Sequence, residues 1–449
     1  MSREAMQVRD ASASYRAQTG AQDVPPGYKR TEVGVIPEDW QTLTLGSMTV
    51  LMTNGFVGTA TRHYDSSENG ILYIQGYNVE ENSFNFHGVK FVTESFHRAN
   101  TKFCLRGGDL LTVQTGDVGL TTIVPEALAG SNCHALIISR FDHKKIFPLF
   151  ISYYLNSNPG RSRLKLIETG TTMKHLNVGD MLQFVVPVPP SKVEQRAIAD
   201  ALSDVDGLLT ALEALIAKKR AIKQAAMQQL LTGKTRLPRF NGKWEVISMA
   251  KHASLKARIG WQALTTGEYL DSGSYYLVTG TDFLNGQVNW STCHFVDEWR
   301  YSQDRNIQLN NGDVLLTKDG TIGKVGYVDN LPGPATLNSG VFVVRPLDNS
   351  FVPLFLFYVL SSRIFDDFLS KITAGSTITH LYQKDFITFE FLAPKIEEQT
   401  AIATVLSDMD AEIAALEARR DKTRAIKQGM MQQLLTGRVR LVEAKGNEV

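Results

Sequence analysis

The sequence predicts an α+β fold of two tandem mixed α/β domains, separated by two long helices that form an antiparallel coiled coil with pseudo-twofold symmetry. Three observations lead to this prediction. A long segment occurs twice, 204 residues apart. Both copies have the apolar spacing of an amphipathic helix. The remaining sequence consists mostly of short apolar runs broken by Gly, Asn and Asp, which are typical of strands and turns.

The repeat identifies the chain as a tandem duplication. Glu194–Leu237 returns as Glu398–Leu441, with 28 identities in 44 aligned positions. Both copies contain Arg-Ala-Ile-Lys-Gln and, two residues later, Met-Gln-Gln-Leu-Leu-Thr-Gly. The globular parts agree only at scattered points of the same offset, such as Trp40 with Trp244. The globular halves have therefore diverged, whereas the helices have hardly changed.

A chain of 449 residues is too long for a single core, so several domains are expected. The expected boundaries are a flexible N-terminal arm at 1–24, domain 1 at 25–190, spacer helix 1 at 191–235, domain 2 at 236–394, spacer helix 2 at 395–437 and a C-terminal tail at 438–449. The predicted strands include Ile71–Ile74, Asp109–Val113, Leu136–Ile138, Tyr275–Val278, Asp313–Leu316 and Val341–Val344. Pro in the first turn predicts one further helix in each domain, at Pro148–Asn156 and Pro353–Arg363.

The two long helices show apolar steps of four and three residues, which predict a coiled-coil seam. Its residues are Ile198, Leu202, Val205, Leu209, Leu212 and Ile216 in the first helix and Ile402, Leu406, Met409, Ile413 and Leu416 in the second. Gly233 and Gly437 are expected to stop the helices. Pairing about a twofold axis makes the helices antiparallel and sends the domains to opposite ends. The alternative is two separate amphipathic helices, each lying on its own domain.

Composition excludes several classes of protein. Nucleic-acid-binding proteins are usually basic, and a net charge of +1 is not typical of them. Any contact with nucleic acid must therefore come from local basic patches. Three cysteines without a CxxC pair favour a cytoplasmic protein with neither a disulfide framework nor a zinc site. No apolar run approaches the roughly 20 residues of a membrane span. The first 23 residues lack the apolar core of a signal peptide.

The sequence contains no GxGxxG or GxxxxGK(S/T) motif of nucleotide binding, no (N/D)PP(Y/F) motif of amino-methyl transfer, no GxSxG motif of hydrolases and no HExxH motif of zinc proteases, so no catalytic residue is assigned. Cys133-His134 and Cys293-His294 lack partner pairs, and no metal site is assigned either. Acidic residues are scattered, although a carboxylate pair formed in space is not excluded.

Recognition features remain. Basic and hydroxyl side chains surround a Gly-containing loop at Gly170–Leu176, and a similar loop recurs at Gly375–Leu381. Such groups suit contacts with phosphates and base edges, but a solvated Gly-rich turn would look the same. The candidate DNA-contacting residues are Arg62, Tyr77, Arg161, Arg163, Lys165, Thr171, Thr172, Lys174 and His175 in domain 1 and Trp261, Thr281, Arg363, Lys371, Ser376, Thr377, Thr379 and His380 in domain 2.

The segment Gly27–Trp40 (GYKRTEVGVIPEDW) resembles the start of a target-recognition domain in the DNA specificity subunits of type I restriction–modification systems (HsdS). The twin helices are similar to the conserved spacer regions of that family. The resemblance covers nearly the whole chain from about residue 25 and departs from the family pattern in the N-terminal arm. Two diverged domains on an undiverged spacer also suit the recognition of two different half-sites at a fixed separation.

The resemblance implies a non-catalytic subunit in which each domain recognises one half of an asymmetric bipartite DNA target. It implies that the helices set the gap and dock two methyltransferase subunits, which bind S-adenosylmethionine, and that endonuclease/translocase subunits using ATP and magnesium join the complex. No cofactor is expected in this chain. The family places the loops with Thr171, Thr172, Lys174, His175, Ser376, Thr377, Thr379 and His380 on the DNA side. Two alternatives stay open: a specificity subunit of a methylation-only or phage-defence complex, and a coiled-coil protein-binding scaffold.

Overall fold

The computed structural model describes residues 24–259, 264–373 and 380–441, which form two compact units. Unit 1 takes its residues from 1–211 and 420–449, and unit 2 takes its residues from 212–419. Each unit therefore contains one globular domain, the first part of the long helix that follows it and the last part of the other long helix. Unit 1 is made of two separate stretches of the sequence, whereas unit 2 is one continuous stretch, because unit 1 takes the last part of its second helix from the end of the chain.

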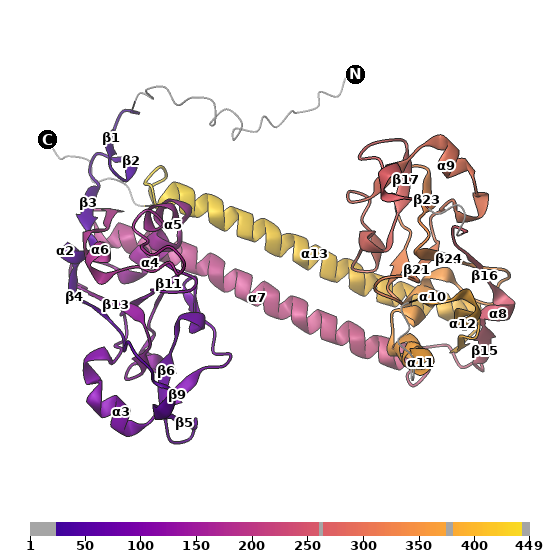
Figure 1. Cartoon of the computed structure of the whole chain (residues 1–449), viewed down its shortest axis with the longest axis horizontal. Coiled ribbons are helices and arrows are strands. Elements are labelled where there is room, and N and C mark those ends of the chain that lie inside the picture. Colours follow the sequence, from indigo (N-terminus) through magenta and orange to yellow (C-terminus); the bar gives the residue numbers. More distant parts are fainter. Residues whose placement is uncertain (1–23, 260–263, 374–379, 442–449) are drawn as a thin grey trace. The chain divides into compact units, whose positions relative to one another are not determined.

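The elements of domain 1 precede the first long helix, α7 (Lys192–Leu230). Its strands are β1 (Tyr28–Thr31), β2 (Gly34–Pro37), β3 (Gln41–Thr44), β4 (Thr49–Asn54), β5 (Tyr64–Asp65), β6 (Ile71–Ile74), β7 (Val79–Glu80), β8 (Ser83–Phe84), β9 (Lys90–Val92), β10 (Leu110–Val113), β11 (Thr121–Ile123), β12 (Asn132–Cys133), β13 (Leu136–Phe141) and β14 (Val185–Val188). Its helices are α2 (Leu45–Met48), α3 (Glu94–Ala99), α4 (Pro148–Asn156), α5 (Asn158–Leu164) and α6 (Val178–Gln183) (Figure 1).

The elements of domain 2 lie between α7 and the second long helix, α13 (Ile396–Leu434). Its strands are β15 (Glu245–Ser248), β16 (Ala253–Lys256), β17 (Tyr275–Val278), β18 (Phe283–Leu284), β19 (Gln287–Val288), β20 (His294–Val296), β21 (Val314–Thr317), β22 (Val325–Tyr327), β23 (Ala335–Leu337), β24 (Val341–Pro346) and β25 (Glu390–Ala393). Its helices are α8 (Met249–His252), α9 (Glu298–Ser302), α10 (Pro353–Leu360), α11 (Arg363–Thr373) and α12 (Gln383–Phe386).

The two domains share one topology. In domain 1 an antiparallel sheet has the order β11–β10–β13–β4, and in domain 2 the corresponding strands have the order β22–β21–β24–β16. A second sheet contains one parallel pair in each domain, β12–β6 and β17–β23. The strand that leads into each long helix pairs with the first strand of its domain's core, as β14–β3 and β15–β25. This correspondence confirms the predicted duplication and mixed α/β class.

The predicted elements agree closely with the observed ones. The helix expected at Pro148–Asn156 is α4, and the strands expected at Ile71–Ile74 and Tyr275–Val278 are β6 and β17. The helix expected at Pro353–Arg363 ends earlier, at Leu360, and α11 begins at Arg363. Ser361 and Ser362 separate the two helices, and the Ser362 hydroxyl accepts a hydrogen bond from the Ile364 amide, as a helix-starting serine does.

The antiparallel helix pairing is confirmed within each unit. In unit 1, Lys427 of α13 forms an ion pair with Asp206 of α7. In unit 2, Lys223 of α7 forms an ion pair with Asp410 of α13. In each pair, the aspartate lies in the first half of its helix and the lysine lies in the second half of the other helix, as antiparallel packing requires.

The predicted seam residues differ in their surroundings. Ile198 and Leu202 belong to the core of domain 1, and Ile402 and Leu406 belong to the core of domain 2. Further along the helices, Leu212, Ile216 and Ile413 are also buried, whereas Val205, Leu209, Met409 and Leu416 are partly exposed. The first turns of each helix thus pack on the domain that precedes them, as the alternative of two domain-bound helices proposed, and the helices also pair. No described helix is long and apolar enough to cross a membrane.

In each unit, a buried glutamate at the start of one long helix pairs with an arginine that follows the end of the other long helix. Arg440 forms ion pairs with Glu194 at the start of α7 and with Asp39, and it lies over the Trp40 ring. Arg236 pairs with Glu398 in the same way and lies over Trp244. Glu194 and Glu398 are almost fully buried, so each depends on its arginine to offset the cost of burying a charge.

Gly233 and Gly437 end the long helices, as predicted, with φ angles of +69° and +71°. Gly437→Ala is expected to lower the free energy of unfolding by about 2 kcal/mol, because such a φ disfavours a side chain and the new Cβ would lie 2.5 Å from Pro37 Cδ. Gly429→Ala is the matched control: this glycine lies inside α13 with nothing within 4 Å of an added Cβ, and alanine should stabilise the helix by about 1 kcal/mol. Chemical denaturation measures both, and indistinguishable transition midpoints would contradict the expectation.

Candidate nucleic-acid interface

In domain 1 three turns converge at the end of β10. The residues after β10, Gln114–Gly119, form the central turn. On one side lies the short 3₁₀ turn Gly76–Asn78, and a Cβ on Gly76 would lie 3.5 Å from the Thr115 carbonyl oxygen. On the other side, Thr115 bridges to His175 and the Leu176 amide donates to the Gln114 carbonyl at 3.1 Å. The three turns therefore form one surface of loop residues at the end of the buried strand β10.

The loop Thr169–His175 is held by its own hydrogen bonds. Thr169 and His175 exchange two backbone hydrogen bonds of 3.0 Å, and the Thr169 hydroxyl is 3.0 Å from His175 Nε2. Gly170 has a φ of +95°, and a Cβ there would lie 2.2 Å from the Met173 carbonyl oxygen. The loop is thus closed tightly at its base, while Thr171, Thr172 and Lys174 are exposed.

Domain 2 builds the same arrangement at the end of β21. The 3₁₀ turn Gly280–Asp282 lies against Thr317, since a Cβ on Gly280 would be 2.7 Å from Thr317 Cγ2. The Leu381 amide donates to the Lys318 carbonyl at 2.8 Å, and Asp319 bridges to His380. The side chains of Asp319 and His380 also form a hydrogen bond, and the His380 ring packs against Tyr382. The two domains therefore present one geometry with different side chains.

The basic cluster on α5 is partly engaged inside domain 1. Arg161 Nη1 donates to the Val118 carbonyl at 3.0 Å, which places this side chain beside the turn after β10. Arg163 donates to the Val185 carbonyl and lies over the Phe184 ring, so it fastens α5 to the strand that leads into α7. Lys165 is exposed at the end of α5. DNA contact by these three residues stays a prediction, and for Arg163 the structure shows a supporting contact inside the domain.

Arg62 and Tyr77 connect to the turns in different ways. Tyr77 lies in the turn beside Thr115, and its hydroxyl donates to the Gly88 carbonyl at 2.8 Å. Arg62 lies in the 3₁₀ turn Thr61–His63, whose neighbour Tyr64 accepts a hydrogen bond of 3.1 Å from the Gln75 amide. Partial burial raises the pKa of Tyr77, and the proton of its hydroxyl is engaged by the Gly88 carbonyl.

The predicted residues of domain 2 fall into three groups. Thr281 is exposed in the turn beside Thr317, with its hydroxyl 2.7 Å from that of Thr279, and His380 lies beside Asp319. Arg363 and Lys371 are exposed on α11, against which the turn after β21 packs through Gly323 and Leu369. Trp261, Ser376, Thr377 and Thr379 lie outside the described residues.

Some residues of these surfaces were not singled out from the sequence. Gln114 and Lys318 occupy the same position directly after β10 and β21, and Lys324 donates to the Gly280 carbonyl at 3.2 Å. In the sequence, Gln114 and Lys318 could have been found only by their position: each directly follows the strand that begins after a Gly-Asp turn. Asn78 and Asp282, polar residues of the same two turns, are buried and cap their own 3₁₀ turns, so they do not face the surface.

Two long stretches of the chain match a known protein family. The model of the type I restriction modification DNA specificity domain matches residues 37–224 and 257–424. The chain belongs to this type I specificity family. Among its relatives, the type I restriction enzyme MjaVIII specificity subunit of Methanocaldococcus jannaschii is 26% identical over 314 residues, which cover 65% of this chain and 70% of the relative.

Two solved structures support the fold. The type I restriction-modification S subunit from M. genitalium has a TM-score of 0.56 at 18% identity, covering 88% of this chain and 96% of its own. A chain from a study of complex assembly and conformational transition of the type I R-M system has a TM-score of 0.54 at 16% identity, covering 90% of this chain and 99% of its own. At these identities they establish the specificity-subunit fold of two tandem domains.

A buried ion pair fixes the strand that carries each surface. Asp109 precedes β10, is 1% exposed and receives two hydrogen bonds of 2.7 and 2.6 Å from Arg140 on the neighbouring β13. Asp313 and Arg345 repeat this pair before β21. The ion pair holds the turn at the start of β10 or β21 against the neighbouring strand. The far end of the strand, where the three turns meet, therefore has a defined position.

Arg140→Met is expected to lower the free energy of unfolding by about 3 kcal/mol, because the buried Asp109 carboxylate would lose its partner. Arg98→Met is the matched control: its ion pair with Glu94 is exposed on α3 and should contribute at most about 0.5 kcal/mol. Thermal and urea unfolding measure both. Equal losses of stability for the two variants would contradict the expectation that the buried ion pair contributes more than the exposed one.

Proposed function

We propose that this chain is the DNA specificity subunit of a type I restriction–modification complex. Domain 1 and domain 2 each recognise one half of an asymmetric bipartite target, and the paired helices set the gap between the half-sites. Family membership supports this function. The observation that carries the two-half-site model is that both domains build the same three-turn surface, at the ends of β10 and β21, from different side chains.

The chemistry of the two surfaces supports contact with duplex DNA. Exposed hydroxyls, amides and a lysine on loops suit hydrogen bonds with phosphates and base edges. At corresponding positions the turns carry different side chains: Tyr77 and Gln114 in domain 1 stand where domain 2 has Thr281 and Lys318. Domain 1 also offers the exposed Thr171, Thr172 and Lys174. Different donors and acceptors on one backbone geometry are what two different half-sites require.

The partners and cofactors are part of the proposal. Two methyltransferase subunits dock on the paired helices, and endonuclease/translocase subunits join the complex. S-adenosylmethionine, ATP and magnesium belong to those partners, and this chain contributes recognition without catalysis. A cytoplasmic location gives the complex access to DNA.

Lys174→Ala is expected to weaken DNA binding similarly on all sequences and to reduce the slope of log K against log salt by about one, because one phosphate contact is lost. The matched control is Lys144→Ala. Lys144 is exposed in the turn after β13, at the opposite end of the same sheet, because β10 and β13 are antiparallel. Affinity should be measured between about 50 and 200 mM salt for the complex with its methyltransferase. An unchanged slope for Lys174→Ala would overturn the phosphate assignment.

A fragment of residues 1–237 is expected to form a homodimer that directs methylation to a symmetric site made of two copies of the first half-site. Each copy supplies Lys223 of α7 and Arg236, which follows α7, and these can replace Lys427 and Arg440 beside the other copy's Asp206 and Glu194. Arg236→Ala should weaken the dimer at least tenfold, because Glu194 would stay uncompensated. Sedimentation and methylation mapping measure these outcomes, and a monomeric fragment would contradict the model.

A further inference from the structure

Each unit contains a polar cluster that joins three elements. In unit 1 the Tyr153 hydroxyl on α4 donates to Asp206 of α7 at 2.7 Å, and Lys427 of α13 pairs with the same carboxylate. Lys427 also lies 5.8 Å from the centre of the Tyr153 ring. We call this set the clamp of unit 1. It connects the recognition domain, its own long helix and the other long helix through one carboxylate.

The clamp recurs in unit 2 with the same residue types. The Tyr358 hydroxyl on α10 donates to Asp410 of α13 at 2.8 Å, and Lys223 of α7 pairs with Asp410. Lys223 lies 5.3 Å from the centre of the Tyr358 ring. Burial and the neighbouring aspartate raise the pKa of both tyrosines, in keeping with hydroxyls that donate to a carboxylate. The two lysines are those of the repeated Arg-Ala-Ile-Lys-Gln motif.

A second contact defines the line along which each domain docks. Gln195, near the start of α7, accepts a hydrogen bond of 2.8 Å from the Phe147 amide, directly before α4. Gln399 accepts one of 2.9 Å from the Val352 amide, directly before α10. Asp206 lies eleven residues beyond Gln195, which is roughly 16 Å along a helix. Two directional contacts this far apart fix the angle between α4 and α7.

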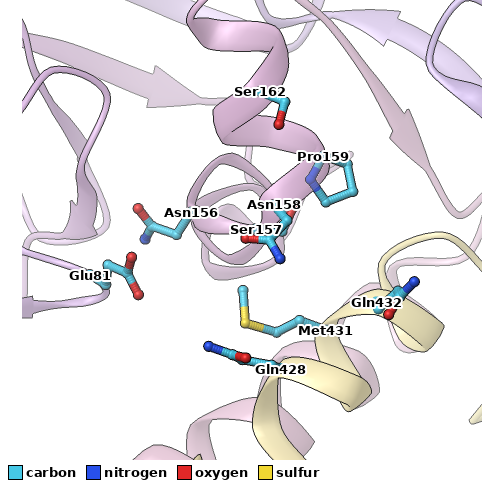
Figure 2. A pocket seen from close by; sticks show the side chains of 9 residues that line it. All are labelled: Glu81, Asn156, Ser157, Asn158, Pro159, Ser162, Gln428, Met431 and Gln432. Carbon is cyan, nitrogen blue, oxygen red and sulfur yellow. The ribbon is translucent and has the colours of Figure 1, made fainter. Parts of the chain in front are cut away.

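Packing alone leaves space beside the clamp. A cavity of about 350 Å³ lies between the end of α4, the start of α5 and α13 in unit 1. Figure 2 shows Gln428 and Met431 of α13 facing Asn156 and Ser157 across it. A cavity of about 690 Å³ lies at the corresponding place in unit 2, lined in part by Gln224, Met227 and Ser361. Because the contact is open at these cavities, the directional bonds of the clamp add to the apolar contacts of Leu434 and Leu435 in unit 1, and of Leu230 and Leu231 in unit 2, in limiting movement of each domain against the other repeat's helix.

We propose that the two clamps are positioning devices that make the complex select one gap length between its half-sites. This inference rests on the proposed function. One extra base pair moves a half-site by about 3.4 Å and turns it by roughly 35°, so a complex can accept the longer gap only if a recognition domain shifts on its helices. Loss of a clamp permits that shift. Contacts with bases inside each half-site are unaffected, because the clamps lie at α4 and α10 rather than at the turns after β10 and β21.

The test uses the full chain assembled with its methyltransferase subunits. Methylation mapping with the parent protein first gives the target. Initial methylation rates are then measured on duplexes that carry the natural gap, a gap one base pair shorter or longer, or a mismatched half-site. The variants are Tyr153→Phe and Tyr358→Phe, which remove only a hydroxyl. Asp206→Asn and Asp410→Asn form a second pair that serves if the phenylalanine variants fail to fold.

Tyr153→Phe and Tyr358→Phe are each expected to reduce the preference for the natural gap by about tenfold, since each loses a hydrogen bond to a charged group. Discrimination against a mismatched half-site should stay unchanged. The control Glu412→Gln removes an ion pair between Lys219 and α13 that does not include the recognition domain, and it should keep the parent's gap preference.

An unchanged gap preference in the clamp variants would overturn the inference. Equal loss of gap and half-site discrimination would also overturn it, because that result means general loosening. If the parent complex shows no bipartite, sequence-dependent methylation, the proposed function itself fails, and this outcome is distinct from the other two.

Discussion

The structure depends on one electrostatic constraint at the start of each long helix. Glu194 and Glu398 are buried carboxylates, and the arginine that pairs with each arrives from beyond the end of the other helix. A buried charge without its partner is costly, so neither unit is complete when only its own half of the sequence is present. The duplication has therefore produced two units that share their helices. Each recognition domain rests on a support that contains residues from both repeats.

This sharing explains the order of the other contacts. Apolar side chains of the first helical turns, such as Ile198 and Leu202, enter the core of the preceding domain. Leu434 and Leu435, from the end of the other helix, belong to the same core. The ion pairs then fix the register between the helices, because Lys427 meets Asp206 and Arg440 meets Glu194. Burial holds the elements together, and the charged pairs select one arrangement.

Much of the fold could be predicted because it depends on local patterns. Pro148 at the start of α4, the glycines that end the long helices and the Gly-Asp turns before β10 and β21 act over a few residues. The candidate surfaces were harder to predict because side-chain partners are distant in sequence. Nothing around Arg163 indicates that its guanidinium meets the Val185 carbonyl, and nothing around Asn78 indicates that it is buried. The strand ends that gather the three turns became visible only with the sheet topology.

The uneven divergence of the helices follows from the same contacts. Each long helix carries an aspartate for its own unit and a lysine for the other unit, as Asp206 and Lys223 do on α7. A change at either position breaks a clamp in one unit, whichever copy it occurs in. Between these positions the two copies differ: Leu215, Ile216 and Ala217 of one copy stand opposite Arg419, Arg420 and Asp421 in the alignment. The ends of the helices are retained because each satisfies two domains at once, while the domains themselves are free to change the surface that they present.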